Sequence, residues 1–201
     1  MSHSELSPLA MRKFVETLFT EISRETVSAI LSKSGLPREW RDPEYFSTLD
    51  GAQSTQAYAN LQLALRTYYG RGARGTLIRL GEKLWEPLLS DAPFAIRTQA
   101  SLIRRLPKAL KRKPALELLA GLLGVKRGDI TVHSLDLDLL LVDRSSPATV
   151  EQKDDSPICY VTLGLIRECL YWATGEQHDI EERACRAVGA GQCEFKITIG
   201  V

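Results

Sequence analysis

The stretch SPICYVTLGLIRECLYWATGEQHDIEERACRAVGAGQCEFKITI, residues 156–199, decides the fold class. Its Ser-Pro opening is typical of a helix start, because serine caps free N–H groups and proline suits the first helical position. Apolar residues at helical spacing then predict a helix that ends at Gly175. Two strands follow, over about 178–187 and 192–199, and the Val-Gly-Ala-Gly between them predicts a hairpin turn.

Upstream of this stretch the chain changes from strands to helices. Ile130–His133 and Leu135–Val142 are predicted strands, and the second begins with alternating apolar and acidic residues. Segregated helices and consecutive strands predict an α+β domain, in which a helical N-terminal half packs on an antiparallel sheet. The helices are expected at about 7–34, 55–69, 76–89 and, broken by prolines, 91–127.

Composition sets the broad class of protein. The 201 residues are 44% hydrophobic and 25% charged, with a net charge of +1, which indicates a globular chain with no overall attraction to nucleic acid. No window of about 18 apolar residues and no leader pattern occurs, so we expect no transmembrane segment and a cytoplasmic location. Residues 1–35 are predicted to be an N-terminal helix with a role in dimerisation, and residues 36–201 the main domain.

Charge is distributed unevenly along the chain. The segment Arg97–Lys113 is strongly basic, whereas residues 129–182 are mainly acidic. A basic run of this kind is most often a solvated helix face. The alternative is a docking surface for an acidic protein partner or a lipid headgroup.

All four cysteines lie after residue 158, which is too few and too late for a secreted disulfide scaffold. Cys185 and Cys193 stand four residues to either side of Gly189, so a hairpin turning there would bring them opposite one another. Their Cβ atoms would be about 5 Å apart, which suits two thiolates on one zinc ion and also permits a disulfide. Cys159, at the start of its predicted helix, is a third candidate ligand because a helix N-terminus favours a thiolate.

The fourth ligand stays open among Glu182, Glu181 and His178. Glu182 and Cys185 would face opposite sides of an ideal strand, so joint ligation by these two requires a bulge. Four protein ligands would leave no position for water, which makes the metal structural and the hairpin zinc-stapled. Cys169 lies on another face of the helix and is expected in the core, where unreactive cysteines are common.

The spacing of these residues resembles the signature of the 4-vinyl reductase domain family, also described as hydrocarbon-binding domains. That signature is a cysteine at a helix start, followed by Glu-x-x-Cys-x-x-x-Gly-x-x-x-Cys-x-Phe, and Cys159, Glu182, Cys185, Gly189 and Cys193 occupy its positions. A looser likeness extends upstream to the tyrosine-glycine turn in YYGRGARGTLIRLGEKLWEPLL, and the resemblance covers residues 10–201. Ala190 departs from the family, which often has an aspartate there, but this position is not a ligand.

The resemblance implies a metal site, a pocket and a fold. Zinc-containing members of the family bind the ion with three cysteines and a glutamate, which would select Glu182 here. Members enclose an apolar pocket for a small hydrophobic molecule, commonly form homodimers, and share a fold with nitric-oxide-sensing domains and Golgi-tethering subunits. Haem-binding relatives need an axial histidine, and His3, His133 and His178 stand in no such context.

The leading hypothesis is therefore a small-molecule-binding or sensory domain that holds an aromatic, lipid or tetrapyrrole ligand beside a structural zinc site. One alternative is an accessory protein or reductase in bacteriochlorophyll synthesis, but no dinucleotide fingerprint occurs, which favours a binding protein over an enzyme. Another is a ligand-free scaffold that uses Arg97–Lys113. The aromatic candidates for the pocket are Trp85, Phe94, Tyr160 and Trp172.

Overall fold

The computed structural model describes residues 5–124, 126 and 128–199. Its helical half contains α1 (Pro8–Glu21), α2 (Arg24–Lys33), α3 (Gly51–Tyr69), α4 (Ala73–Ser90), α5 (Phe94–Arg105) and α6 (Lys108–Leu123). The remainder contains β1 (Ile130–Leu135), β2 (Asp138–Asp143), α7 (Tyr160–Thr174), β3 (Asp179–Ala184) and β4 (Cys193–Thr198). Short 3-10 turns complete it: η1 (Arg38–Arg41), η2 (Pro43–Thr48), η3 (Gly70–Gly72), η4 (Pro147–Thr149) and η5 (Arg186–Val188).

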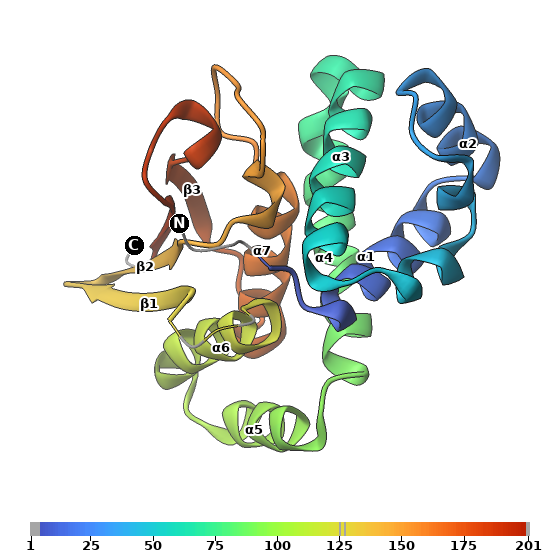
Figure 1. Cartoon of the computed structure of the whole chain (residues 1–201). Helices are drawn as coiled ribbons and strands as arrows, with labels where there is room; N and C mark the ends of the chain where they lie inside the picture. Colours follow the sequence, from blue (N-terminus) through green and yellow to red (C-terminus); the bar gives the residue numbers. More distant parts are fainter. Residues whose placement is uncertain (1–4, 125, 127, 200–201) are drawn as a thin grey trace.

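The four strands form one antiparallel sheet in the order β1-β2-β4-β3. Helix α7 lies between this sheet and the group formed by α3 and α4 (Figure 1). One continuous core joins the two halves, from Phe14 and Leu18 on α1 to Phe195 and Ile197 on β4, and all four side chains are buried. The predicted α+β architecture, with helices concentrated in the N-terminal half and a C-terminal hairpin, is confirmed.

Helices α4 and α7 cross so closely that each contributes a glycine at the contact. A Cβ atom added to Gly81 would overlap the carbonyl oxygen of Val161, and one added to Gly164 would overlap the carbonyl oxygen of Ile78. Because only glycine lacks this atom, the two backbones pack directly against each other. This contact fixes the position of α7, whose first turn carries part of the site described below.

Three predicted boundaries are wrong. The single helix expected over residues 7–34 is two helices, because Ile22 is extended and the Ser23 hydroxyl accepts the N–H of Thr26 to begin α2. The helix expected from Ser156 begins only at Tyr160. The strand expected to continue to residue 187 ends at Ala184, where η5 begins the connection to β4.

Candidate metal centre

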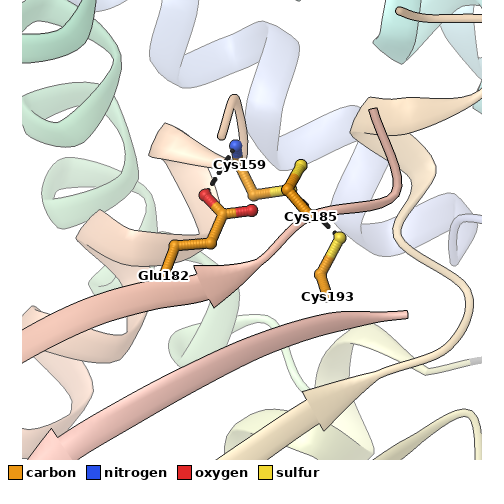
Figure 2. Close-up of side chains that lie close together, drawn as sticks. All are labelled: Cys159, Glu182, Cys185 and Cys193. Atoms are coloured by element: carbon orange, nitrogen blue, oxygen red, sulfur yellow. Dashed lines mark hydrogen bonds between the residues drawn. The ribbon is translucent and has the colours of Figure 1, made fainter. Parts of the chain in front are cut away.

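Three chain segments bring four potential metal ligands together. Cys159 is the N-cap residue of α7, Glu182 lies on β3, Cys185 directly follows β3, and Cys193 begins β4. One ligand atom from each residue lies within 4.8 Å of the others, and the four side chains converge between α7 and the hairpin (Figure 2). These are the four residues selected by the family resemblance, and they lie close enough to hold one metal ion.

A break in strand register makes this arrangement possible. Glu182 pairs with Phe195 whereas Ala184 pairs with Glu194, so the pairing shifts between the two positions. The extra residue on β3 changes the alternation of side chains, which would otherwise put Glu182 and Cys185 on opposite faces. The bulge that the sequence required for joint ligation is present.

The sulfur atoms form a compact, buried group of free thiols. The Sγ atom of Cys159 lies 3.9 Å from that of Cys185 and 3.6 Å from that of Cys193. The exposed fractions of Cys159, Cys185 and Cys193 are 1%, 2% and 0%. The backbone N–H of Arg186 also donates to the sulfur of Cys193 at 3.4 Å, which would stabilise a thiolate there.

Glu182 has one carboxylate oxygen engaged and one without a hydrogen-bond partner. Its Oε2 accepts the backbone N–H of Cys159 at 3.1 Å. Its Oε1 is buried and accepts no hydrogen bond from any residue that the structure describes. A buried carboxylate oxygen left without a donor is costly unless a cation or an ordered water meets it, so the donor set of three sulfurs and one oxygen fits a divalent metal.

The electrostatics of the cluster favour a cation. The pKa of the Cys159 thiol is raised well above its usual value by the neighbouring Cys185 and Cys193 and by burial. Burial raises the pKa of Glu182 to about 8, whereas hydrogen bonds from Cys159 and Cys193 lower the pKa of Cys185. One thiolate that accepts hydrogen bonds from two thiols is the metal-free form, and a divalent ion would replace the remaining protons.

A second layer of residues, which the sequence analysis missed, holds the loop between β2 and α7 against the cysteines. The buried Oδ1 atom of Asp143 accepts the backbone N–H groups of Ser145 and Ser146, at 2.9 and 2.7 Å, and the Ser145 hydroxyl at 2.8 Å. The Ser146 hydroxyl then lies 3.4 Å from Cys159 Sγ and 3.1 Å from Cys193 Sγ. The local signal is Asp-x-Ser-Ser at 143–146, because an aspartate often accepts N–H groups two and three residues later.

The alternative fourth ligands contact other groups. His178 Nε2 accepts from Arg112 Nε at 3.0 Å, and Glu181 forms an ion pair with Arg183 at 3.5 Å. Arg186 donates instead to the carbonyl oxygen of Ser145 at 2.7 Å. Cys169 lies in the core as expected, with its sulfur 3.2 Å from the carbonyl oxygen of Ala115.

The four predicted pocket aromatics do not gather at one place. Trp85 and Trp172 pack edge to face with their ring centroids 5.4 Å apart. Tyr160 and Trp172 lie in the first and last turns of α7, a separation of about 18 Å along the helix axis. Phe94 is 76% exposed at the start of α5, so it does not fit the prediction of an interior pocket residue.

Comparison with known proteins locates a family match in the C-terminal part of the chain. Residues 142–199 match the model of the 4-vinyl reductase domain, which confirms the resemblance over the segment that carries the metal centre. An uncharacterized protein of Methanocaldococcus jannaschii is 35% identical over 86 residues, which are 36% of this chain. The aligned part spans only 38% of the length of that relative.

Solved structures share the fold over a larger part of the chain. An H-NOX protein from S. oneidensis in the Fe(II)NO state has a TM-score of 0.56 and 14% identity, and the match covers 96% of this chain and 99% of that protein. An H-NOX protein from K. algicida gives 0.57 at 12% identity, with 96% of both chains covered. The phenol-responsive sensory domain of the transcription activator PoxR, with phenol, gives 0.50 at 14% identity over 71% of this chain and 73% of that one. The predicted fold relationship to nitric-oxide-sensing domains is confirmed.

The histidines of this chain do not suit a haem iron. His133 is exposed on β1 and lies 2.9 Å from the Thr131 hydroxyl. His178 is half-buried and engaged by Arg112. Neither of these described histidines faces the helical core, so neither provides an axial ligand there. His3 lies outside the described residues. Among the described helices, none is long and apolar enough to span a bilayer.

Proposed function

We propose that this chain is a small-molecule-binding module that holds a small, mainly hydrophobic ligand and is stabilised by a structural Zn²⁺ ion. The fold supports the first part of the proposal, because the related structures include a sensory domain bound to phenol and H-NOX proteins with ligated iron. The family match and the four-residue cluster support the second. The bound metal supplies stability, since four protein ligands leave no open position for a substrate.

The proposed zinc ligands are Cys159, Glu182, Cys185 and Cys193. Three thiolates and one oxygen form a donor set that zinc accepts readily in tetrahedral sites. Cys159 begins α7, and the other three ligands belong to the hairpin. Zinc would therefore connect the start of α7 to β3 and β4 in a part of the fold that has no disulfide.

A buried amide on α3 carries the small-molecule part of the proposal. Gln62 is 0% exposed, and neither its Nε2 nor its Oε1 atom has a hydrogen-bond partner among the described residues. Tyr58, one turn earlier, interacts with Gln62 without reaching hydrogen-bond geometry. One turn later, Arg66 Nη1 is also buried and unpartnered, while its Nη2 donates to Gln152 at 3.2 Å.

These unpartnered atoms lie on the side of α3 that approaches η4, Gln152 and the metal centre. An unsatisfied buried amide is costly and needs a partner. A ligand hydroxyl would accept from Gln62 Nε2 and donate to Oε1, while its apolar part would contact the surrounding core. The preferred ligand class is a small aromatic or aliphatic molecule with one hydroxyl group, and phenol is a suitable probe.

Native mass spectrometry of the full chain, compared with its denatured mass, tests both parts. We expect one zinc ion per chain and an additional organic mass, and a tetrapyrrole mass would indicate the accessory role in bacteriochlorophyll synthesis. A chain purified without metal, which also takes up none from added Zn²⁺, would refute the zinc proposal. The same experiment measures the predicted homodimer.

Substitution of the buried amide tests the ligand position. Gln62→Leu is expected to abolish phenol binding measured by calorimetry while it preserves or raises stability, because it removes an unsatisfied polar group. Gln56→Leu is the matched control on the same helix, since Gln56 bonds to Asn60 at 3.2 Å. Equal phenol affinity in the two variants would exclude Gln62 from the binding site.

A further inference from the structure

The corner formed by α5 and the first half of α6, residues 94–113, projects from the body of the protein (Figure 1). On α5 only Ile96, Ala100 and Ile103 turn toward the body, and every other residue of this helix is exposed. All seven residues from Arg104 to Leu110 are exposed as well. The corner therefore offers a large surface of its own.

Four large apolar side chains lie on this exposed corner. The exposed fractions are 76% for Phe94, 57% for Leu102, 37% for Leu106 and 60% for Leu110. Single exposed apolar residues are ordinary on a protein surface, but a group of them on one projecting feature indicates a contact with another apolar phase.

The same residues are accompanied by strong positive charge. Residues 94–113 contain seven lysines and arginines and no acidic residue. Lys108 and Arg112 form ion pairs with Glu176 at 2.6 and 3.0 Å. Within the described part of the chain, no carboxylate lies within salt-bridge distance of Arg104, Arg105 or Lys113. Three of the seven cations are thus available to an external anion.

A small pocket adjoins the corner and has the same mixed character. It has a volume of about 290 Å³ and is lined by Arg97 and Arg104 together with the apolar side chains of Leu89, Ala100 and Trp172. Guanidinium groups beside an apolar surface suit a molecule that has an anionic head and an apolar body.

We propose that residues 94–113 form a docking surface for an anionic lipid bilayer. The basic side chains would contact lipid phosphates, and Phe94, Leu102 and Leu110 would enter the headgroup boundary. A symmetric contact with a second copy of this chain is disfavoured, because it would place two acid-free basic surfaces against each other. An acidic protein would satisfy the charges but not require four exposed apolar side chains between them. This proposal does not depend on the small-molecule ligand or on zinc.

Co-sedimentation of the full chain with phospholipid vesicles tests the proposal. We expect binding to vesicles of phosphatidylcholine that contain about one third phosphatidylglycerol, and none to phosphatidylcholine alone. Each basic residue near an anionic surface strengthens binding about fivefold, so Arg104→Gln/Arg105→Gln/Lys113→Gln is expected to weaken it about 100-fold. Leu102→Ser/Leu110→Ser is expected to weaken binding at both low and high salt, because apolar insertion is not screened.

The matched control removes three positive charges elsewhere. Arg38→Gln/Arg71→Gln/Arg74→Gln has the same net charge as the corner variant, and its positions lie exposed on η1, η3 and α4. This control is expected to bind vesicles within about twofold of the wild type. The proposal is overturned if the control loses as much affinity as the corner variant, or if the chain binds polyglutamate but not anionic vesicles.

Discussion

The addition of one methyl group at Gly81 tests whether α4 and α7 pack backbone to backbone. The Cβ of Gly81→Ala would overlap the carbonyl oxygen of Val161 and lie 2.9 Å from its carbonyl carbon and 3.0 Å from the amide nitrogen of Leu165. Ordinary contact begins at 3.4 Å, and backbone atoms cannot rotate away as a side chain does. Overpacking of this kind costs about 1–3 kcal/mol, and the upper end applies here because the obstacle is backbone. Since alanine gains about 1 kcal/mol over glycine within a helix, we expect a net loss of about 2 kcal/mol.

Gly75→Ala makes the same chemical change in the same helix and serves as the control. No atom lies within 4 Å of a Cβ added at Gly75, so this variant should keep the helical gain of up to about 1 kcal/mol. Urea unfolding of both variants, with zinc and with a chelator, measures the difference. Val161 lies two residues after Cys159, so Gly81→Ala should also reduce zinc affinity. If Gly81→Ala proves as stable as Gly75→Ala, the close crossing of α4 and α7 is refuted.

Three further predictions concern the metal centre and its surroundings. Cys193→Ala should lose zinc, measured by elemental analysis, and several kcal/mol of stability, whereas Cys169→Ala should retain a full equivalent; zinc retained by both would show that the cluster is not the site. Asp143→Ala leaves two buried N–H groups and the Ser145 hydroxyl without their acceptor and should cost about 2–3 kcal/mol in urea unfolding, whereas a change below about 0.5 kcal/mol would contradict this role. Burial lowers the pKa of His178, so the unfolded chain takes up that proton first as the pH falls below about 6.5, and folding stability decreases there. His178→Gln should therefore show a shallower loss of stability over this range, and parallel curves for variant and wild type would rule out the contribution.

The cysteine cluster was predictable because its signal is local, but the choice of the fourth ligand was not. Spacing alone ranked Glu182, Glu181 and His178 equally. The selection depends on the bulge between Glu182 and Ala184, which arises from the pairing of β3 with β4. A strand register is a long-range property, so residue spacing within one strand does not contain it. The family resemblance supplied this choice.

The start of α7 was misplaced for a related reason. Ser156 and Pro157 are a strong local start signal, yet the helix begins at Tyr160. The N–H of Cys159 donates to Glu182, and its sulfur lies among the other thiols. These tertiary contacts hold Cys159 in a non-helical conformation, with φ −79° and ψ 45°, and so outweigh the local preference.

Phe94 shows how far an aromatic residue can be interpreted from sequence. Its helix is amphipathic, and large aromatics mostly occupy cores, which made an interior position the natural expectation. The face of α5 that turns inward depends on α4 and α6, however, and that face carries Ile96, Ala100 and Ile103. Phe94 is consequently exposed, and its exposure is one of the observations that support the lipid-docking surface.

Helix α7 is held at both ends and in its middle, which restricts how ligand binding can change the structure. Cys159 belongs to the metal cluster, Gly164 packs directly on the backbone of α4, and Trp172 packs on Trp85. A sliding or rotation of α7 against α4 would have to break all three contacts together, because tightly packed interfaces do not deform continuously. The side of α3 that carries Gln62 has unpartnered polar atoms instead, and these atoms gain hydrogen bonds when a ligand enters. Binding energy at this position therefore acts mainly on the contact between α3 and the η4 loop, while α7 and the metal centre provide the rigid wall against which that contact changes.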